Sequence, residues 1–305
     1  IKGKGSLLED FLSLARPSQN GHLRYTKESS DDLVRASVRA SYLFWRSVES
    51  LANSTNCQKH LLSRPDSGMI WTGWQPPAMG GDRSRSLIKH LAAFDPISLA
   101  ELNGVALLDR IEVKYLLPVA AVSDVLLRLR SSYSALSAAE QQLHHYRTLY
   151  FDTPDLAMYR RHHMGARIRY KVRARQYVDS RITFLEVKHK TNKRHTVKSR
   201  LPTNELVTAM NRCSLEFLRD KCPYNAIELV PTLWNTYSRI TLASKTRCER
   251  VTLDLNLAFA WDGRKMDLPA VVVAEVKRDG SSHESDFMTL MRQIGMRKTG
   301  FSKYC

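Results

Sequence analysis

Residues 166–175 alternate between apolar and basic side chains at every position, and no other feature of the sequence constrains the fold more. Successive side chains of a β-strand point to opposite faces of the sheet. One face of such a strand would carry Arg167, Arg169, Lys171, Arg173 and Arg175. The other face would carry Ala166, Ile168, Tyr170, Val172 and Ala174. The pattern predicts a half-buried strand within residues 165–177.

Other segments divide their side chains in the same way. One face is charged in each of the groups Arg110, Glu112 and Lys114; Glu186, Lys188 and Lys190; Lys198 and Arg200; Arg250, Thr252 and Asp254; and Glu275 and Lys277. Strands are expected over residues 110–115, 145–151, 165–177, 180–190, 195–201, 227–235, 237–243, 250–259 and 271–278, with helices over 118–129, 204–218 and 284–294. About eight antiparallel strands with a few flanking helices predict an α+β fold built on a closed antiparallel β-barrel.

Two interpretations of the charged faces are open. Alternation of this kind is typical of a solvent-facing sheet. However, like charges side by side destabilise a sheet, and a solvated face has no reason to repeat a Glu-x-Lys unit. Charged faces turned inward would line a barrel whose interior holds one small ligand. A bound polyanion would offset the repulsion there.

The overall charge favours a polyanionic partner. The chain has 47 Lys and Arg against 30 Asp and Glu, a net charge of +17. Residues 158–200 hold 14 of these basic residues against only Asp179 and Glu186. Such an excess predicts binding to a phosphorylated molecule, an anionic membrane or nucleic acid.

The organisation predicted is an N-terminal extension, residues 1–93, followed by one domain, residues 94–305. A helix is expected over Asp31–Ala52, and residues 63–85 are rich in Pro, Gly and Ser. No run of 18 apolar residues predicts a membrane span. The five scattered cysteines and the lack of a signal peptide favour a cytoplasmic location. The chain begins with Ile1 instead of Met, so we expect a fragment.

The carboxylates on the charged faces suggest a metal. Glu112, Glu186, Asp254 and Glu275 each lie among Lys or Arg. Hard oxygen ligands of this kind hold Mg²⁺ or Mn²⁺. The alternative is that each carboxylate simply pairs with a basic neighbour, and for Asp254 that neighbour would be Arg250. The pairs His144–His145 and His162–His163 are interpreted as structural or surface residues.

Seven motifs occur in one order along residues 94–304. They are Tyr146-Arg-Thr-Leu-Tyr-Phe-Asp-Thr-Pro154 with Tyr159-Arg-Arg-His-His-Met-Gly165, Arg167-Ile-Arg169, Phe184-Leu-Glu-Val-Lys188, Lys198-Ser-Arg200, Arg250-Val-Thr-Leu-Asp254, Ala274-Glu-Val-Lys277 and Ser302-Lys-Tyr304. This order resembles the catalytic domain of the vacuolar transporter chaperone (VTC) complex and its bacterial relatives, which are triphosphate tunnel metalloenzymes. Residues 1–93 resemble nothing in that family.

The resemblance implies a polyphosphate polymerase that passes the γ-phosphate of ATP to a growing polyphosphate chain, with Mn²⁺ or Mg²⁺ as cofactor. Together with the charged faces it suggests three groups of site residues. The catalytic group is Arg167, Arg169, Lys188, Lys198 and Arg200. The phosphate-binding group is Lys114, Arg110, Arg250, Lys277 and Lys303. The metal-binding group is Glu275, Glu186 and Glu112.

Two other functions remain open at this point. Related tunnel enzymes cleave inorganic triphosphate or nucleoside triphosphates, and the same lumen could admit water as the acceptor. A basic barrel could also bind a polyanion without chemistry. Nucleic acid is the less favoured partner, because RNA-binding sheets present aromatic side chains on an exposed face. The expected ligands are therefore ATP and inorganic polyphosphate, and a membrane-bound protein partner is left open.

Overall fold

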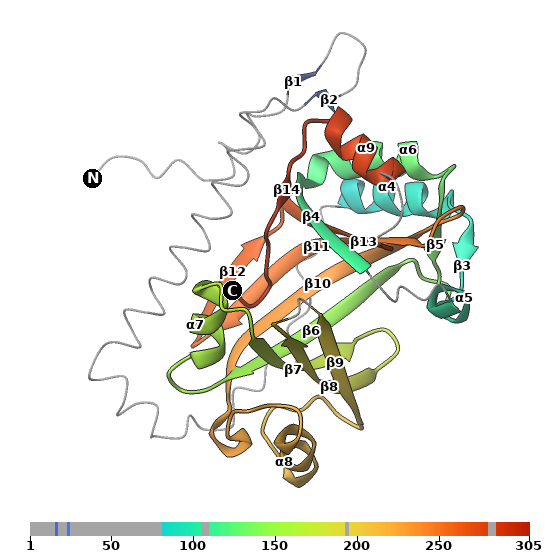
Figure 1. Ribbon diagram of the computed structural model, residues 1–305. Coiled ribbons are helices and arrows are strands. Elements are labelled where there is room, and N and C mark those ends of the chain that lie inside the picture. Colours follow the sequence, from blue (N-terminus) through green and yellow to red (C-terminus); the bar gives the residue numbers. More distant parts are fainter. Residues whose placement is uncertain (1–15, 18–22, 25–80, 105–109, 193–194, 280–284) are drawn as a thin grey trace.

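The computed structural model describes residues 16–17, 23–24, 81–104, 110–192, 195–279 and 285–305 (Figure 1). The helix expected over Asp31–Ala52 lies outside the described residues, as does most of the expected extension. Within that extension, β1 (Arg16–Pro17) pairs antiparallel with β2 (Leu23–Arg24). The rest of the description concerns residues 81–305.

One large sheet organises this part of the chain. Its strands are β3 (Pro96–Ile97), β4 (Arg110–Pro118), β5 (Tyr133–Leu136), β6 (Leu143–Asp152), β7 (Arg169–Tyr177), β8 (Ile182–Lys190), β9 (Thr196–Thr203), β10 (Val230–Ser244), β11 (Glu249–Trp261), β12 (Arg264–Leu268), β13 (Val271–Asp279) and β14 (Lys298–Thr299). The main path of hydrogen-bonded neighbours runs β14-β4-β13-β11-β10-β6-β7-β8-β9. Every pairing along this path is antiparallel. The antiparallel sheet with few helices is as predicted.

The predicted closure into a barrel is wrong. The path of paired strands begins at β14 and ends at β9, and among the described residues these two ends do not pair. Closure requires one continuous hydrogen-bonded ladder with a matching stagger. The short strand β14 pairs with β4 at Tyr115 and Lys114 and therefore occupies the edge that a closing strand would need. The sheet is open along this edge.

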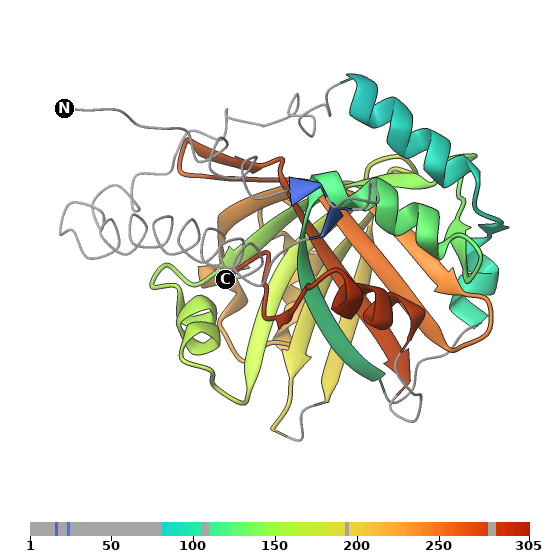
Figure 2. The same ribbon diagram turned by 90° about the horizontal axis from the view of Figure 1, so that it is seen from above.

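Three helices group on one side of the sheet (Figures 1 and 2). They are α4 (Gly81–Ala92), α6 (Val122–Leu129), which follows the short helix η1 (Val119–Ala121), and α9 (Asp286–Gln293). Leu87 and Leu91 of α4, Leu126 of α6 and Phe287 of α9 share one buried cluster with the apolar face of β13. The helix α4 thus packs against α6 and shares this buried cluster, although it precedes residue 94, where the sequence suggests the domain begins.

A second core lies under β7 and β8. Val172, Ala174, Leu185 and Val187 are buried there, together with Leu218 of α8 (Arg212–Arg219). The helix expected over residues 204–218 begins only at Arg212. Its start is fixed by the side chain of Asn211, which accepts a hydrogen bond from the Ser214 amide, as N-cap residues do.

Two further boundaries differ from the prediction. The strand expected from residue 165 begins at Arg169, because α7 (Ala157–His163) precedes it and Gly165 adopts a left-handed conformation with φ of 71°. The two strands expected over 227–243 form the single strand β10, with a register shift between Thr236 and Ser238. The remaining elements are α5 (Leu99–Gly104) and the short helix η2 (Ala226–Glu228). None of the described helices has both the length and the apolar character needed to span a bilayer.

Candidate functional site

A cavity of about 810 Å³ collects the charged rows of the sheet. Its lining includes Glu112 and Lys114 of β4 from one end of the strand path and Lys188 and Thr196 of β8 and β9 from the other. The open sheet is therefore rolled around a shared space. Among the described residues that line the cavity, ten are Lys or Arg and two are Glu, so the cavity is strongly cationic.

Seven of the residues suggested from the sequence line this cavity. They are Lys114, Arg169, Lys188, Lys277, Lys303, Glu112 and Glu275. Five others are not among the lining residues, namely Arg167, Lys198, Arg200, Arg250 and Glu186. For Arg110 the structure describes only the backbone, which pairs with Asp279. Arg167 is exposed and precedes the first residue of β7, so the alternation of the strand does not turn it inward.

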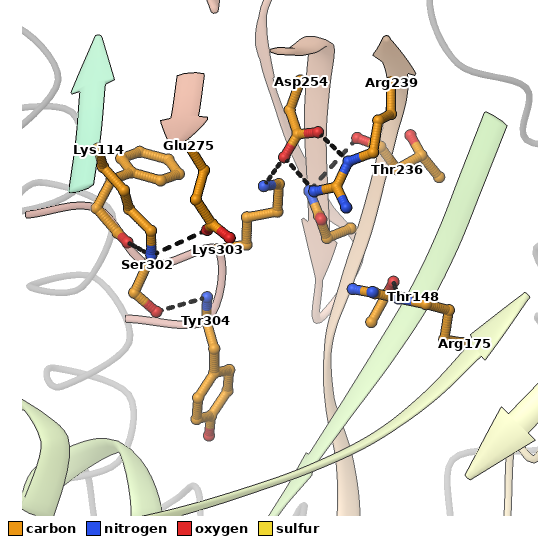
Figure 3. Close-up of polar contacts among 12 residues, drawn as sticks. Lys114, Thr148, Arg175, Thr236, Arg239, Asp254, Glu275, Ser302, Lys303 and Tyr304 are labelled. Atoms are coloured by element: carbon orange, nitrogen blue, oxygen red, sulfur yellow. Dashed lines mark hydrogen bonds and ion pairs between the residues drawn. The ribbon is translucent and has the colours of Figure 1, made fainter. Parts of the chain in front are cut away.

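The β4–β13 side of the cavity holds both lining glutamates, Glu112 and Glu275, and Figure 3 shows Glu275 beside Lys114. Lys114 Nζ lies 3.0 Å from Glu112 Oε1 and 3.5 Å from Glu275 Oε2, and Lys277 Nζ lies 2.6 Å from Glu275 Oε1. Burial alone would raise the pKa of Glu275, but Lys277 and Lys114 outweigh it and hold that pKa well below its usual range. Glu275 therefore stays ionised between two lysines.

Glu186 is a buried counter-ion beside the cavity. Its side chain is 1% exposed, and three cations meet its carboxylate: Arg173 at 2.7 Å, Lys198 at 2.5 Å and Arg200 at 3.1 Å. Burial would raise the pKa of Glu186, but Arg173, Arg175 and Lys198 lower it far below its usual range. Of the three cations, Arg173 lines the cavity. Glu186 thus holds Arg173 in the cavity wall from behind.

Asp254 has a similar position on the other side of the cavity. Arg239 Nε lies 2.5 Å from Asp254 Oδ1, and Arg239 Nη2 lies 2.8 Å from Oδ2. Lys303 Nζ also donates to Asp254 Oδ2 (Figure 3). The partner of Asp254 expected from the sequence was Arg250, whereas the structure pairs Asp254 with Arg239 and Lys303.

The last residues of the chain contribute to the same wall. Lys114 Nζ donates to the Phe301 carbonyl at 3.1 Å, and Lys171 Nζ donates to Ser302 Oγ at 2.7 Å. The ring of Tyr304 stacks on Tyr150, with ring centroids 4.9 Å apart. Residues 301–304 therefore contact β4, β11, β6 and β7, which together extend over most of the strand path.

Several lining residues were missed by the reasoning from sequence. Lys171, Arg173 and Arg175 belong to the basic row of β7 but were given no role, although the alternation alone could have assigned one. Arg239 is the single basic residue within β10, so no repeated pattern marks it. Tyr237 lines the cavity, and its buried hydroxyl has no hydrogen-bond partner in the described part of the chain.

His162 was interpreted as a structural residue, yet it lines the cavity. Burial lowers its pKa to about 3, and the nearby cations Lys171, Arg169, Lys114 and Lys188 add to this effect. Its imidazole is therefore neutral near pH 7, and the buried Nδ1 atom has no partner among the described residues. A neutral histidine among lysines and arginines reflects how positive the cavity is.

The donor set can be compared with what a divalent cation requires. No group of three His, Cys, Asp or Glu side chains with the arrangement of a metal site occurs among the described residues. Mg²⁺ is, however, commonly held by one or two carboxylates together with the phosphates of its substrate. Glu112 and Glu275 are two cavity-lining carboxylates on neighbouring strands, and they fit this kind of site.

The arrangement suits an extended anion with many oxygen atoms. Lys171 and Lys188 are directly opposite on β7 and β8, and Lys188 is opposite Lys198 on β9. Like charges in these positions destabilise a sheet. A polyanion along these strands would relieve the repulsion, and the planar guanidinium groups of Arg169 and Arg173 suit the binding of two phosphate oxygens at once.

The solved structures that are similar to this chain share little sequence with it. No curated protein matches it. Solved structures with detectable similarity include an adenylate cyclase candidate from Vibrio parahaemolyticus, with 12% identity over 64% of this chain and 94% of that chain and a TM-score of 0.39. Another, from Bacillus halodurans, has 14% identity over 64% and 94% of the two chains and a TM-score of 0.41. An adenylyl cyclase candidate from Hippeastrum, described as having a dominant triphosphatase activity, has 15% identity over 64% and 93% and a TM-score of 0.39.

The sequence profile of the VTC domain matches residues 109–305. This range begins just before β4 and ends at the last residue, so it includes every side chain named above as part of the cavity wall. Because the match extends over well over half of the 305 residues, the chain belongs to the VTC domain family.

Proposed function

We propose that this chain is a polyphosphate polymerase, which transfers the γ-phosphate of ATP to the end of a polyphosphate chain. The observation that carries the proposal is the cavity itself: inward cations from β4, β7, β8, β10 and β13, with two carboxylates on one side only. Membership of the VTC domain family supports the same conclusion. A passive anion-binding site would have no use for the two carboxylates.

The chemistry asks little of the protein beyond position and charge. A terminal oxygen of the polyphosphate attacks the γ-phosphorus of ATP, a new P–O–P bond forms, the bond to the β–γ bridging oxygen breaks, and ADP leaves. Charge spreads over the transferred group in such a transition state, and fixed cations stabilise it. Arg169, Lys188 and Arg173 are assigned to the phosphates, since they line the cavity on the side without carboxylates.

Glu275 and Glu112 are assigned to the metal. A Mn²⁺ or Mg²⁺ ion held by these two carboxylates would neutralise part of the negative charge of the phosphates. Glu275 is ionised, so it is ready to act as a ligand without losing a proton first. Glu186 is not assigned to the metal, because three cations already surround its buried carboxylate.

The direct test is to incubate the protein with ATP and Mn²⁺ and to separate the products on a gel stained for polyphosphate. The proposal predicts a ladder of long chains and the release of ADP. Free orthophosphate without polymer would instead indicate a triphosphatase, in which water is the acceptor. Binding of polyphosphate without any turnover would indicate a non-catalytic module, and either result would reject the proposal.

A further inference from the structure

We propose that Asp254 is a positioning residue, which fixes Arg239 and Lys303 so that both cations act on the same phosphate chain. The inference rests on the proposed function for the identity of the ligand. It concerns a residue that does not itself line the cavity, whereas both of its partners do. Asp254 would therefore act only through Arg239 and Lys303.

The hydrogen bonds of Asp254 define the position of Arg239. The guanidinium uses Nε and Nη2 on the two carboxylate oxygens, at 2.5 and 2.8 Å, which is the paired geometry that fixes an arginine in orientation as well as in place. The pairing is also set by the backbone, because Arg239 and Asp254 are directly opposite on β10 and β11. The Nη1 group remains available to a ligand.

The same carboxylate binds the end of the chain. Lys303 lies in the segment after β14, which has no strand neighbour of its own at this point, and its ammonium donates to Asp254 Oδ2. The ammonium also lies 4.5 Å from the centre of the Tyr237 ring, so two elements of the sheet restrain it. Through one carboxylate, β10, β11 and the last residues of the chain converge on one part of the cavity (Figure 3).

Charge and burial show why a carboxylate is required here. Asp254 is 1% exposed. Burial would raise its pKa, but Arg239 and Lys303 lower it to about 2. One negative charge thus balances one of two half-buried cations, which leaves the group with a net positive charge for an anion. Without Asp254, Arg239 and Lys303 would repel each other and would lose the group that orders them.

Two roles for Asp254 predict opposite results in the variant D254N. If Asp254 only reduced the positive charge of the cavity, its neutralisation would strengthen the binding of an anion. If Asp254 positions the two cations, neutralisation weakens binding despite the gain in net positive charge. The probe is inorganic tripolyphosphate, and its dissociation constant is measured by titration calorimetry without turnover.

We expect D254N to bind tripolyphosphate at least about 30-fold more weakly than the wild type, as for other buried charge pairs that lose one partner. D254E keeps the charge but displaces both cations by one methylene, so its affinity should lie between the two. This second variant keeps the test intact if D254N does not fold. Equal or tighter binding by either variant would overturn the inference.

Glu249 provides the matched control. It is a buried glutamate of the same strand, 2% exposed, five residues from Asp254 and therefore on the opposite face of β11, where it accepts a hydrogen bond from Tyr133 at 2.5 Å. E249Q should leave tripolyphosphate affinity unchanged. Thermal unfolding monitored by circular dichroism identifies any variant whose loss of binding reflects loss of fold.

A double-mutant cycle tests the route through Lys303. In a K303A background, the fold-change in the dissociation constant caused by D254N should be at least about three times smaller than in the wild type, because one of the two partners of Asp254 is gone. A fully additive result would overturn the positioning role. Wild-type protein that binds tripolyphosphate but makes no polymer would reject the proposed function alone, whereas polymer synthesis with unweakened D254N binding would reject this inference alone.

Discussion

Lys114 of β4 lies directly opposite Glu275 of β13, and Lys114 Nζ is 3.5 Å from Glu275 Oε2. Glu112 and the Phe301 carbonyl also accept from this ammonium, so its charge is balanced within the protein. On β7 and β8, by contrast, Arg169 and Lys188 have no carboxylate within ion-pair distance among the described residues. The cavity is thus divided into a side suited to a metal and a side suited to phosphates.

Substitution of Glu275 tests the metal side. E275Q should lose the Mn²⁺-dependent turnover, because it removes one of the two cavity carboxylates and the counter-ion of Lys277. Turnover is measured over a series of Mn²⁺ concentrations. The control is E216Q, in the exposed Arg212–Glu216 pair on α8. An unchanged Mn²⁺ response in E275Q would contradict the assignment.

Substitution of Arg169 tests the phosphate side. R169A should lower the rate at least about 100-fold, the loss typical when one fixed donor to a developing charge is removed. The fold should remain, because Arg169 is the first residue of β7 and belongs to no buried apolar cluster. R212A is the control, since its side chain is 91% exposed on α8. Near-normal turnover in R169A would remove Arg169 from the site.

His162 should make the folded protein less stable in acid. Its pKa is about 3 in the folded state, against about 6.5 in an unfolded chain. Between these values the unfolded state binds the proton and the folded state does not, so stability falls as the pH falls from about 6.5 towards 3. The variant H162N should show a flatter decline in thermal midpoint over this range. An identical decline in both proteins would show that His162 has no part in it.

The same histidine should report on anion binding. A phosphate chain in the cavity offsets the cations that disfavour a charged imidazole, so tripolyphosphate should raise the pKa of His162. The pKa is measured by NMR titration of the imidazole with and without tripolyphosphate, and His90 of α4, which is not among the cavity-lining residues, provides an internal comparison. A pKa that does not rise on binding would place the anion elsewhere.

Tyr237 should contribute a hydroxyl to the ligand. Its buried O–H lacks a described partner, so Y237F removes no internal hydrogen bond and should leave the thermal midpoint of the ligand-free protein unchanged. Its ring still stacks on Tyr146, with centroids 5.0 Å apart. A lost hydrogen bond to a charged group should weaken tripolyphosphate binding by about tenfold. Unaltered affinity would mean that the hydroxyl does not reach the ligand.

The individual strands and their charged faces could be predicted from the sequence, because side-chain alternation depends only on residues within one strand. On β7 the basic row from Arg169 to Arg175 faces the cavity, while Val172 and Ala174 are buried on the other face. Arg167 follows the same alternation in the sequence, but the turn at Gly165 delays the strand. Periodicity does not reveal where a strand begins.

The open edge of the sheet could not be predicted in this way. Whether β9 pairs with β4 depends on residues about 90 positions apart, and the short strand β14 settles the question by occupying that edge. Arg239 and the role of Asp254 were hidden for a related reason. Arg239 and Asp254 lie on different strands, and only the register of β10 against β11 brings them together.

A crystal structure with inorganic tripolyphosphate tests the central claim most directly, namely that the rolled sheet encloses a binding site for a phosphate chain. The account predicts a chain of phosphates inside the cavity, within hydrogen-bond distance of Arg169, Arg239 and Lys303. Tripolyphosphate bound only on the outer surface, for example at the exposed Arg160 and Arg161 of α7, with the cavity free of phosphate, would contradict it.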